Sequence, residues 1–326
     1  MKKEAVLSAK DLEIGYRRGK KEIPVLQELN FDLRTGQLVC LMGPNGIGKS
    51  TLIKTLCKAQ KPLAGSIQLA DKSLSHYTIQ EFAFSVSVVL TDSINIGNLT
   101  VGEVIAFGRY PHTSWTINFT NRDKEAIQKA IKHAGVEDIT GRRIFELSDG
   151  QRQKVMIARA LCQETPVIIL DEPTAHLDLN NRVEVINLLK KLSRESNKAI
   201  LMATHELDLA LQAADELWIV GADQKLIKGF PEDLVLNGKI DEVFNLKGFD
   251  LKTGYLEKTI SKESIDVIGD GHLYLWTKNA LERNGFGVDP GAKKKIEIIQ
   301  SRDKTIWKNE KGAQFDSLKS VIESLL

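Results

Sequence analysis

Short apolar runs alternate along this chain with stretches in which apolar residues recur at helical spacing. The runs are four or five residues long, too short for helices, and therefore predict buried strands; they span residues 38–42, 167–170, 199–203 and 217–220. Between two of them, residues 181–192 place Val185, Ile186, Leu189 and Leu192 on one face, which predicts an amphipathic helix. Strands and helices that alternate in this way indicate an α/β fold on a largely parallel sheet.

Two parts of the chain depart from this alternation. Residues from about 95 to 160 show helical patterns at 101–107 and 122–134 and little strand signal, which predicts a helical insertion. The last segment, residues 256–326, predicts a separate small α+β appendix, so that the main domain covers residues 1–255.

The appendix has its own order of elements. Residues 264–268 and 294–300 alternate like strands, residues 273–284 have a helical pattern, and the last apolar face, which begins at Leu318, predicts a helix capped by Asp316. The appendix carries no chemical motif. We expect Trp276 and Trp307 to lie in its core or at an interface, with the core favoured, and Lys293 to Lys295 to form a solvated loop.

Composition narrows the class of protein. The 326 residues include 42% hydrophobic and 27% charged residues, which is ordinary for a globular chain. Because the net charge is only +2, composition gives no reason to expect nucleic acid as a partner. The three cysteines, Cys40, Cys57 and Cys162, lie far apart and predict buried thiols of a reduced compartment. No signal peptide and no apolar run of bilayer length is evident, so we expect any membrane role to come through a partner.

The strongest chemical motif follows the first predicted strand. Gly43-Pro44-Asn45-Gly46-Ile47-Gly48-Lys49-Ser50 matches the phosphate-binding loop G-x-x-x-x-G-K-[ST], and a helical run starts at Thr51. In such a loop the backbone N–H groups surround the phosphates, Lys49 adds a positive charge, and Ser50 can ligate Mg²⁺. A glycine-rich turn that merely precedes a lysine is the alternative, and the strand and helix on either side argue against it.

A pair of carboxylates ends the buried run at 167–170. In a nucleotide hydrolase these divide the work: Asp171 holds Mg²⁺, directly or through water, and Glu172 polarises the attacking water. By themselves two acidic residues after an apolar strand are more often a solvated strand end. The phosphate loop upstream reverses that preference.

The order of further motifs resembles the ATP-binding cassette (ABC) ATPases over roughly residues 4–250. Leu147-Ser-Asp-Gly-Gln151 resembles the signature of that family, and Ala175-His-Leu-Asp178 resembles its D-loop. His205, after the run at 199–203, matches the switch histidine, and Tyr16 fits the aromatic residue that stacks on adenine. Taken alone, a histidine after a strand is more often a structural residue.

The resemblance implies a phosphate-loop ATPase core with a helical subdomain and an N-terminal antiparallel β subdomain. It implies that two copies assemble head to tail, so that one copy presents Ser148, Gly150, Gln151 and Asp178 to the nucleotide of the other, and that His205 contacts the γ-phosphate. ATP and Mg²⁺ are the implied cofactors. The residues support an anion site independently, because Ser148 offers a hydroxyl and Gly150 an N–H at the start of a helical run.

The chain departs from the family pattern at two places. Asp149 stands where the family usually has glycine, and since a carboxylate near a phosphate is repulsive, we expect its side chain to point away. The glutamine expected after the strand before the helical insertion is missing, and Thr91 or Asp92 stands there instead. Asp92 is either a substitute metal ligand or a residue that caps or turns the loop.

Within the family, Gly108-Arg-Tyr-Pro-His112 resembles the importers of iron-siderophore, haem and cobalamin complexes; the alternative is an ordinary helix terminus stopped by Pro111. The prediction is an ATP-hydrolysing subunit that works as a homodimer on the cytoplasmic face of a membrane permease. Two alternatives stay open: a cassette ATPase that works without a permease, and an inactive regulatory cassette, for which the missing glutamine is the only support.

Overall fold

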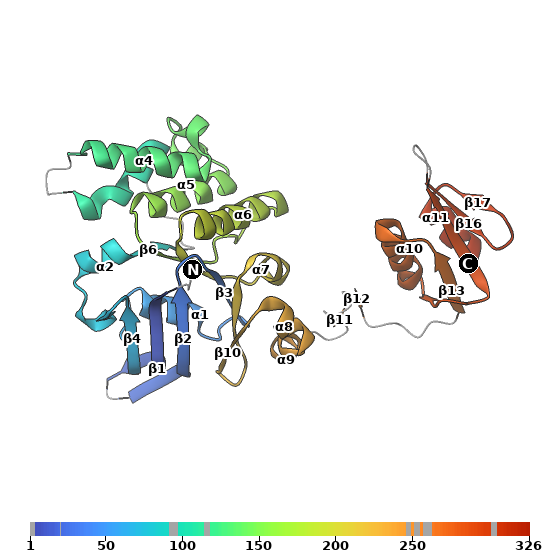
Figure 1. Ribbon diagram of the computed structural model, residues 1–326, viewed down its shortest axis with the longest axis horizontal. Helices are drawn as coiled ribbons and strands as arrows, with labels where there is room; N and C mark the ends of the chain where they lie inside the picture. The colour runs from blue at the N-terminus through green and yellow to red at the C-terminus, as the bar shows by residue number, and fades with distance from the viewer. Residues whose placement is uncertain are drawn as a thin grey trace. The chain divides into compact units, whose positions relative to one another are not determined.

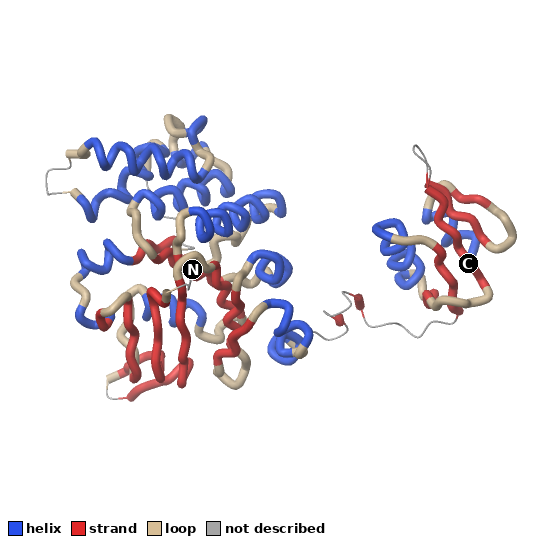
Figure 2. The backbone as a smooth tube through the Cα atoms, viewed as in Figure 1, coloured by secondary structure: helices blue, strands red, loops and turns tan. Residues whose placement is uncertain are grey.

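The computed structural model describes residues 4–19, 21–90, 97–113, 118–245, 249–250, 255–256, 263–300 and 305–326. The chain forms two compact units, Met1–Leu246 and Lys247–Leu326 (Figures 1 and 2). Among the described residues, no helix is both long enough and apolar enough to cross a lipid bilayer.

The first unit begins with an antiparallel sheet of strand order β2-β1-β4-β5. Its strands are β1 (Ala5–Arg18), β2 (Lys21–Arg34), β4 (Ala64–Leu69) and β5 (Lys72–Ser73). Buried and exposed residues alternate along much of β2, as expected of a strand with one face on a core. This sheet is the antiparallel subdomain that the family resemblance implied.

The second sheet of this unit has the order β10-β9-β3-β8-β7-β6, and only β10 runs antiparallel to its neighbour. Its strands are β3 (Leu38–Met42), β6 (Val86–Val89), β7 (Val167–Asp171), β8 (Ala199–Ala203), β9 (Glu216–Val220) and β10 (Leu226–Gly229). The four strands predicted from apolar runs are therefore present and parallel. All five residues of β3 and of β8 are buried, which explains why these segments are apolar runs without alternation.

The strand order decides where the chemistry gathers. β8 lies between β3 and β7, and the phosphate loop, His205 and the pair Asp171–Glu172 lie at or just past the carboxyl ends of these three strands. In parallel sheets those ends share one edge, which is where ligands bind. Residues that are far apart in the sequence are thus brought to one edge.

Helices connect most of these strands, and two more, α8 and α9, follow the last strand (Figure 1). They are α1 (Lys49–Leu56), α2 (Ile79–Ser85), α6 (Leu179–Glu195), α7 (Leu207–Ala213), α8 (Pro231–Leu236) and α9 (Lys239–Phe244), with the 3₁₀ turn η1 (Leu74–His76). The predicted helix at 181–192 is part of α6, and its four predicted core residues are all buried.

The predicted helical insertion is present. It contains α3 (Val101–Ala106), α4 (Asn121–Ala134) and α5 (Asp149–Cys162), with the 3₁₀ segments η2 (Phe107–His112), η3 (Glu137–Ile139) and η4 (Ile144–Glu146). Helices α3, α4 and α5 each begin with a capping box, in which the N-cap side chain and the side chain three residues on bond each other's backbone N–H.

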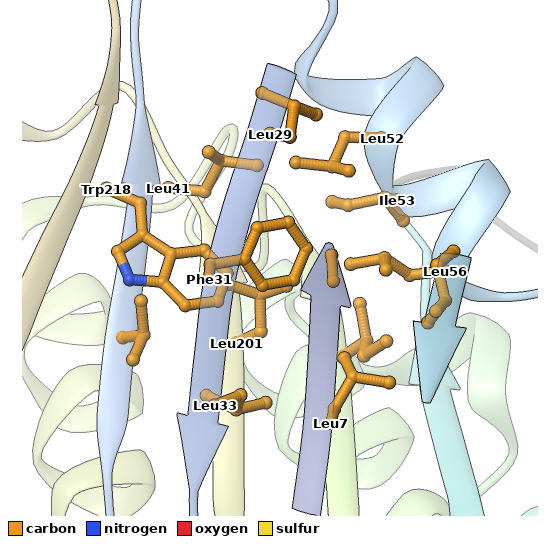
Figure 3. Packing of buried hydrophobic residues seen from close by; sticks show 14 of the residues in the cluster. Leu7, Leu29, Phe31, Leu33, Leu41, Leu52, Ile53, Leu56, Leu201 and Trp218 are labelled. Carbon is orange, nitrogen blue, oxygen red and sulfur yellow. The ribbon is translucent and has the colours of Figure 1, made fainter. Parts of the chain in front are cut away.

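A continuous core joins the two sheets of the first unit through α1. Phe31 of β2 packs on Trp218 of β9 with ring centroids 4.5 Å apart, and Leu52 and Leu56 of α1 fill the space beside them (Figure 3). Since α1 begins in the phosphate loop, the loop leads directly into a helix whose Leu52, Ile53 and Leu56 are buried in this core.

The second unit contains a five-stranded sheet of order β14-β13-β15-β16-β17. Its elements are β13 (Glu263–Ile268), α10 (Gly271–Arg283), β14 (Phe286–Val288), β15 (Lys294–Gln300), β16 (Thr305–Asn309), β17 (Gln314–Phe315) and α11 (Leu318–Leu325); β11 (Phe249–Asp250) and β12 (Tyr255–Leu256) form a separate short pair. Its buried core shares no residue with the core around α1.

Three details of the appendix were predicted wrongly. Ser317, not Asp316, caps α11, since its hydroxyl accepts a hydrogen bond from the N–H of Ser320. Trp307 is buried as expected, but Trp276 is 64% exposed, so the favoured core placement is wrong for it; it lies on a different face of α10 from the buried Thr277 and Leu281. The lysine run does not form a loop: Lys294 and Lys295 begin β15.

Candidate active site

The phosphate loop joins β3 to α1 in a backbone path that requires glycine. Gly43, Gly46 and Gly48 have φ values of 149°, 78° and 119°, which side chains other than hydrogen rarely allow. A Cβ at Gly43 would lie 2.7 Å from the carbonyl oxygen of Val220, and one at Gly48 would lie 2.6 Å from Val25. The motif therefore has the geometry for which its glycines are needed, and Asn45 and Gly46 at its tip are exposed.

Lys49 lies over this loop. Its Nζ donates hydrogen bonds to the carbonyl oxygens of Gly43 at 2.8 Å and Pro44 at 3.2 Å. Burial lowers the pKa of Lys49, and the negative charges of Glu172 and Asp171 oppose that shift. The ammonium is thus aimed at the centre of the loop rather than into solvent.

Asp171 at the end of β7 meets Ser50 at the start of α1. Burial, together with the Glu172 carboxylate beside it, raises the pKa of Asp171, while a hydrogen bond from the Ser50 side chain and the charge of Lys49 lower it. A hydroxyl and a carboxylate side by side form an oxygen donor set of the kind that Mg²⁺ prefers. Among the described residues no cluster of three or more acidic, His or Cys side chains is placed to hold a metal ion.

Glu172 and His205 face each other across the ends of β7 and β8. The Oε2 atom of Glu172 lies 3.4 Å from Nδ1 of His205, whose side chain is half exposed. The backbone of Glu172 has a φ of 46°, an uncommon conformation for a residue with a side chain, and such strain is concentrated at functional sites. Both residues therefore lie at the carboxyl edge of the sheet, next to the phosphate loop.

Tyr16 of β1 is placed beside the first turn of α1. Its hydroxyl lies 3.0 Å from Oγ1 of Thr51, while the side chain as a whole is about half exposed. The hydrogen bond anchors the far end of the ring and leaves a flat surface accessible for stacking.

The signature residues lie at the start of α5. Ser148 is the N-cap: its Oγ accepts from the N–H of Gln151, and Oε1 of Gln151 accepts from the N–H of Ser148. The hydroxyl hydrogen of Ser148 stays available to donate, so the cap is compatible with the predicted anion site. A Cβ at Gly150 would lie 2.3 Å from Oδ1 of Asn181, which shows that the start of α5 packs closely against α6.

Asp178 in the predicted D-loop is the N-cap of α6, accepting from the N–H of Asn181 at 2.8 Å. Asp149 is exposed and forms an ion pair with Arg152 at 3.1 Å. Thr91 and Asp92, which stand in place of the expected glutamine, lie outside the described residues.

Two charged residues of this region were missed by the sequence reasoning. Glu206 follows His205 directly, and its Oε1 lies 3.5 Å from Nε2 of that histidine. Arg182, one helical turn after Asp178, forms an ion pair with Glu206 at 2.9 Å. Each residue lies next to a motif that the sequence shows, Glu206 after the switch histidine and Arg182 after the D-loop, and this position could have marked both as candidates. Their pairing, however, results only from the packing of α6 against the end of β8.

The segment from Gly108 to His112 has a clear structural role. Arg109 is buried, and its guanidinium contacts Asp123 and Glu164 at 2.8 Å each and donates to the carbonyl oxygen of Cys162. Pro111 lies inside η2 rather than ending a helix before it. This segment holds α4 to the end of α5.

A cavity of about 500 Å³ opens near the end of α1 that lies away from the phosphate loop. Its lining includes Arg17, Thr55, Lys58, Lys61 and Leu74 and none of those predicted site residues that the structure describes. It is therefore distinct from the site described above.

Comparison with known proteins agrees with this geometry. An ABC transporter family model matches residues 26–175, and the model of an iron ABC transporter C-terminal domain matches residues 261–326. An uncharacterised ABC transporter ATP-binding protein of Methanocaldococcus jannaschii, MJ0873, is 36% identical over 88% of this chain and 99% of its own length. The chain belongs to the ABC family.

The chain is also similar to ABC proteins whose names or structures state what they bind. The ferric enterobactin transport ATP-binding protein FepC of Escherichia coli is 32% identical over 74% of this chain and 88% of its own. A solved dimer of the ATP-binding cassette MJ0796 with ADP and phosphate superposes with a TM-score of 0.58 at 25% identity, over 69% of this chain and 98% of that one. The chain is thus an ATP-binding and ATP-hydrolysing ABC subunit, as its motifs predict.

Proposed function

We propose that this ABC subunit powers a metal-chelate importer, and that Lys49, Asp171, Glu172 and His205 perform its ATP hydrolysis. The observation that carries the assignment of roles is their convergence at the carboxyl edge of β3, β8 and β7. Lys49 binds the phosphates, Glu172 polarises the attacking water, and His205 contacts the γ-phosphate. Tyr16 stacks on the adenine.

Ser50 and Asp171 fit a Mg²⁺ ion, because a hydroxyl and a carboxylate lie together at the phosphate loop. The ion, when bound, neutralises charge on the phosphates. Ser50 and Asp171 would be the two protein ligands of such an ion.

The active form in this proposal is a head-to-tail dimer. The start of α5 carries Ser148, Gly150 and Gln151, whose contacts within one chain run to each other and to α6, which leaves the helix N-terminus for the nucleotide of the second copy. The solved MJ0796 cassette is also a dimer, which supports the arrangement.

The partner in this proposal is a membrane permease, reached from the cytoplasmic face. Ile79 and Phe84 of α2 and Tyr110 of η2 are exposed apolar side chains, and Phe84 packs edge-on against His112 of η2 with centroids 4.9 Å apart. Exposed apolar side chains on two elements that contact each other favour an interaction surface. FepC, named for ferric enterobactin, and the iron-transporter C-terminal domain model favour a ferric siderophore as cargo.

The test is uptake into vesicles that contain this chain together with a permease of the metal-chelate importer class. ATP-dependent uptake of a ferric siderophore supports the proposal. Uptake of cobalamin but not of a ferric siderophore would show that the proposed cargo is wrong. Ile79→Asp should abolish co-purification with the permease while the ATPase activity of the isolated chain is kept. Unchanged co-purification would place the permease surface elsewhere.

A further inference from the structure

His205 lies between two carboxylates, one near each ring nitrogen. Glu172 Oε2 lies 3.4 Å from Nδ1, and Glu206 Oε1 lies 3.5 Å from Nε2. The orientation of the imidazole therefore depends on where both carboxylates are held. Glu172 has a chemical role in the proposed function, whereas Glu206 has none so far.

Both the backbone and the side chain of Glu206 form hydrogen bonds that hold it in place. Its backbone N–H donates to Oγ1 of the buried Thr204 at 3.1 Å, and its carboxylate accepts from Nη1 of Arg182 at 2.9 Å. The Glu206 side chain is 17% exposed, so its ion pair is screened less by water than one at the surface. Arg182 is the cation that balances this charge.

Arg182 is in turn fixed by the D-loop and α6. Its Nε donates to the carbonyl oxygen of Leu177 at 2.6 Å, and its backbone N–H bonds the carbonyl oxygen of Asp178 at 2.9 Å. One guanidinium thus uses two of its donors in fixed directions, which a lysine ammonium cannot reproduce. The first turn of α6 also carries Asn181, which meets the start of α5 at Gly150.

The charge of Glu206 explains why this cation is needed. A second carboxylate beside His205, uncompensated, would attract the imidazole and repel the phosphates of a nucleotide bound at the same edge. Paired with Arg182, the carboxylate can orient the ring at lower electrostatic cost. The pair joins α6, which follows the D-loop, to the residue that follows the switch histidine.

We propose that Arg182 is a positioning residue for ATP hydrolysis: through Glu206 it sets the orientation of His205. This inference rests on the role of His205 in the proposed function. Arg182 contacts no reacting atom in this scheme, so its loss should reduce turnover without weakening the binding of ATP.

The test is steady-state ATP hydrolysis by the full chain carrying Arg182→Ala, His205→Ala or both. Arg182→Ala should lower kcat by roughly 10- to 100-fold, the size of effect expected of a misplaced catalytic group, with KM for ATP unchanged. His205→Ala should lower kcat by about 100-fold or more. In the His205→Ala background, Arg182→Ala should have little further effect, because both changes remove one function. Arg182→Lys should restore only part of the lost rate.

Arg194→Ala is the matched control, since Arg194 lies on the same helix and forms only a long, exposed ion pair with Asp215 at 3.9 Å among its described contacts. It should leave kcat unchanged. If Arg182→Ala does not fold, Glu206→Gln replaces it in the same cycle. Additive effects of the two substitutions, or a change confined to KM, would overturn the positioning role. An unchanged kcat in His205→Ala alone would instead overturn the proposed role of the histidine.

Discussion

Oε2 of Glu172 lies 3.4 Å from Nδ1 of His205, although the two residues follow different strands. The contact exists because β7 and β8 are neighbours and parallel, with Asp171 in register with Ala203. The Glu172 carboxylate and the His205 ring are thereby placed at the same edge of the sheet as the phosphate loop.

Glu172→Gln should bind ATP but hydrolyse it slower by a factor of about 100 or more, because the amide keeps the size of the side chain and loses its basicity. The variant should accumulate as an ATP-bound dimer, which light scattering after size-exclusion chromatography measures. Glu195→Gln, at the exposed end of α6, is the control and should hydrolyse normally. A purely monomeric Glu172→Gln chain in ATP and Mg²⁺ would contradict the head-to-tail site.

Lys49→Ala should weaken ATP binding by roughly 10- to 100-fold, the equivalent of losing a hydrogen bond to a charged group. Titration calorimetry measures the change. Lys54→Ala removes an exposed lysine from the same helix and serves as the control for general charge loss. Equal affinities of Lys49→Ala and the unmodified chain would refute the phosphate site.

Tyr16→Phe keeps the aromatic surface and loses only the hydrogen bond to Thr51. We expect it to bind ATP nearly as well as the unmodified chain, whereas Tyr16→Ala should bind several-fold less tightly, since stacking is worth on the order of 1 kcal/mol. Competition between ATP and GTP gives a second measurement, because loss of stacking affects both purines. A strong defect in Tyr16→Phe would show that the hydroxyl, not the ring, is what matters.

Asp123 links stability to acid pH. The Thr120 hydroxyl and N–H and the buried Arg109 lower the pKa of Asp123 to about 2. Because the folded-state pKa is below the unfolded value of about 4, this stabilisation is complete above pH 4 and is lost as pH falls toward 2. Asp123→Asn should cost roughly 3 kcal/mol at pH 7, as expected when a buried ion pair loses one partner.

Urea unfolding at pH 7, 4 and 2.5 measures this effect, and the difference between Asp123→Asn and the unmodified chain should shrink toward the lowest pH. Glu103→Gln is the matched control, because Glu103 occupies the same capping-box position at Thr100 on an exposed surface. It should cost much less. A pH-independent difference at Asp123 would show that packing, not charge, is responsible.

A chain that ends at Leu256 should fold and bind ATP with unchanged affinity. Every residue assigned to phosphate, metal or water lies before residue 207, and the two units have separate cores. We expect the shortened chain to dimerise less readily, the role we predict for the second unit. Loss of ATP binding with an intact circular dichroism spectrum would mean that the second unit completes the site.

Contiguous motifs could be predicted from the sequence because each carries its own backbone geometry. The loop from Gly43 to Ser50 needs glycines at fixed places, whatever surrounds it, and the fully buried strands β3 and β8 need apolar residues throughout. Helix capping is also a local feature, but both Asp316 and Ser317 are residue types that cap helices well. Only the backbone conformation shows that Ser317 is the N-cap of α11.

Long-range packing decided which of the remaining side chains are buried and which of them contact each other. Trp307 is buried and donates to Thr277, while Trp276 on α10 is exposed, because the rotation of about 100° per residue in a helix places neighbours on different faces. The sequence by itself predicted a nucleotide-hydrolysing site, since the eight-residue phosphate loop, the two carboxylates and the ordered family motifs are all contiguous patterns. Which charges act together was decided by the tertiary structure alone: Arg182 and Glu206 meet only because α6 packs beside the end of β8, and no local pattern encodes a contact between two separate segments.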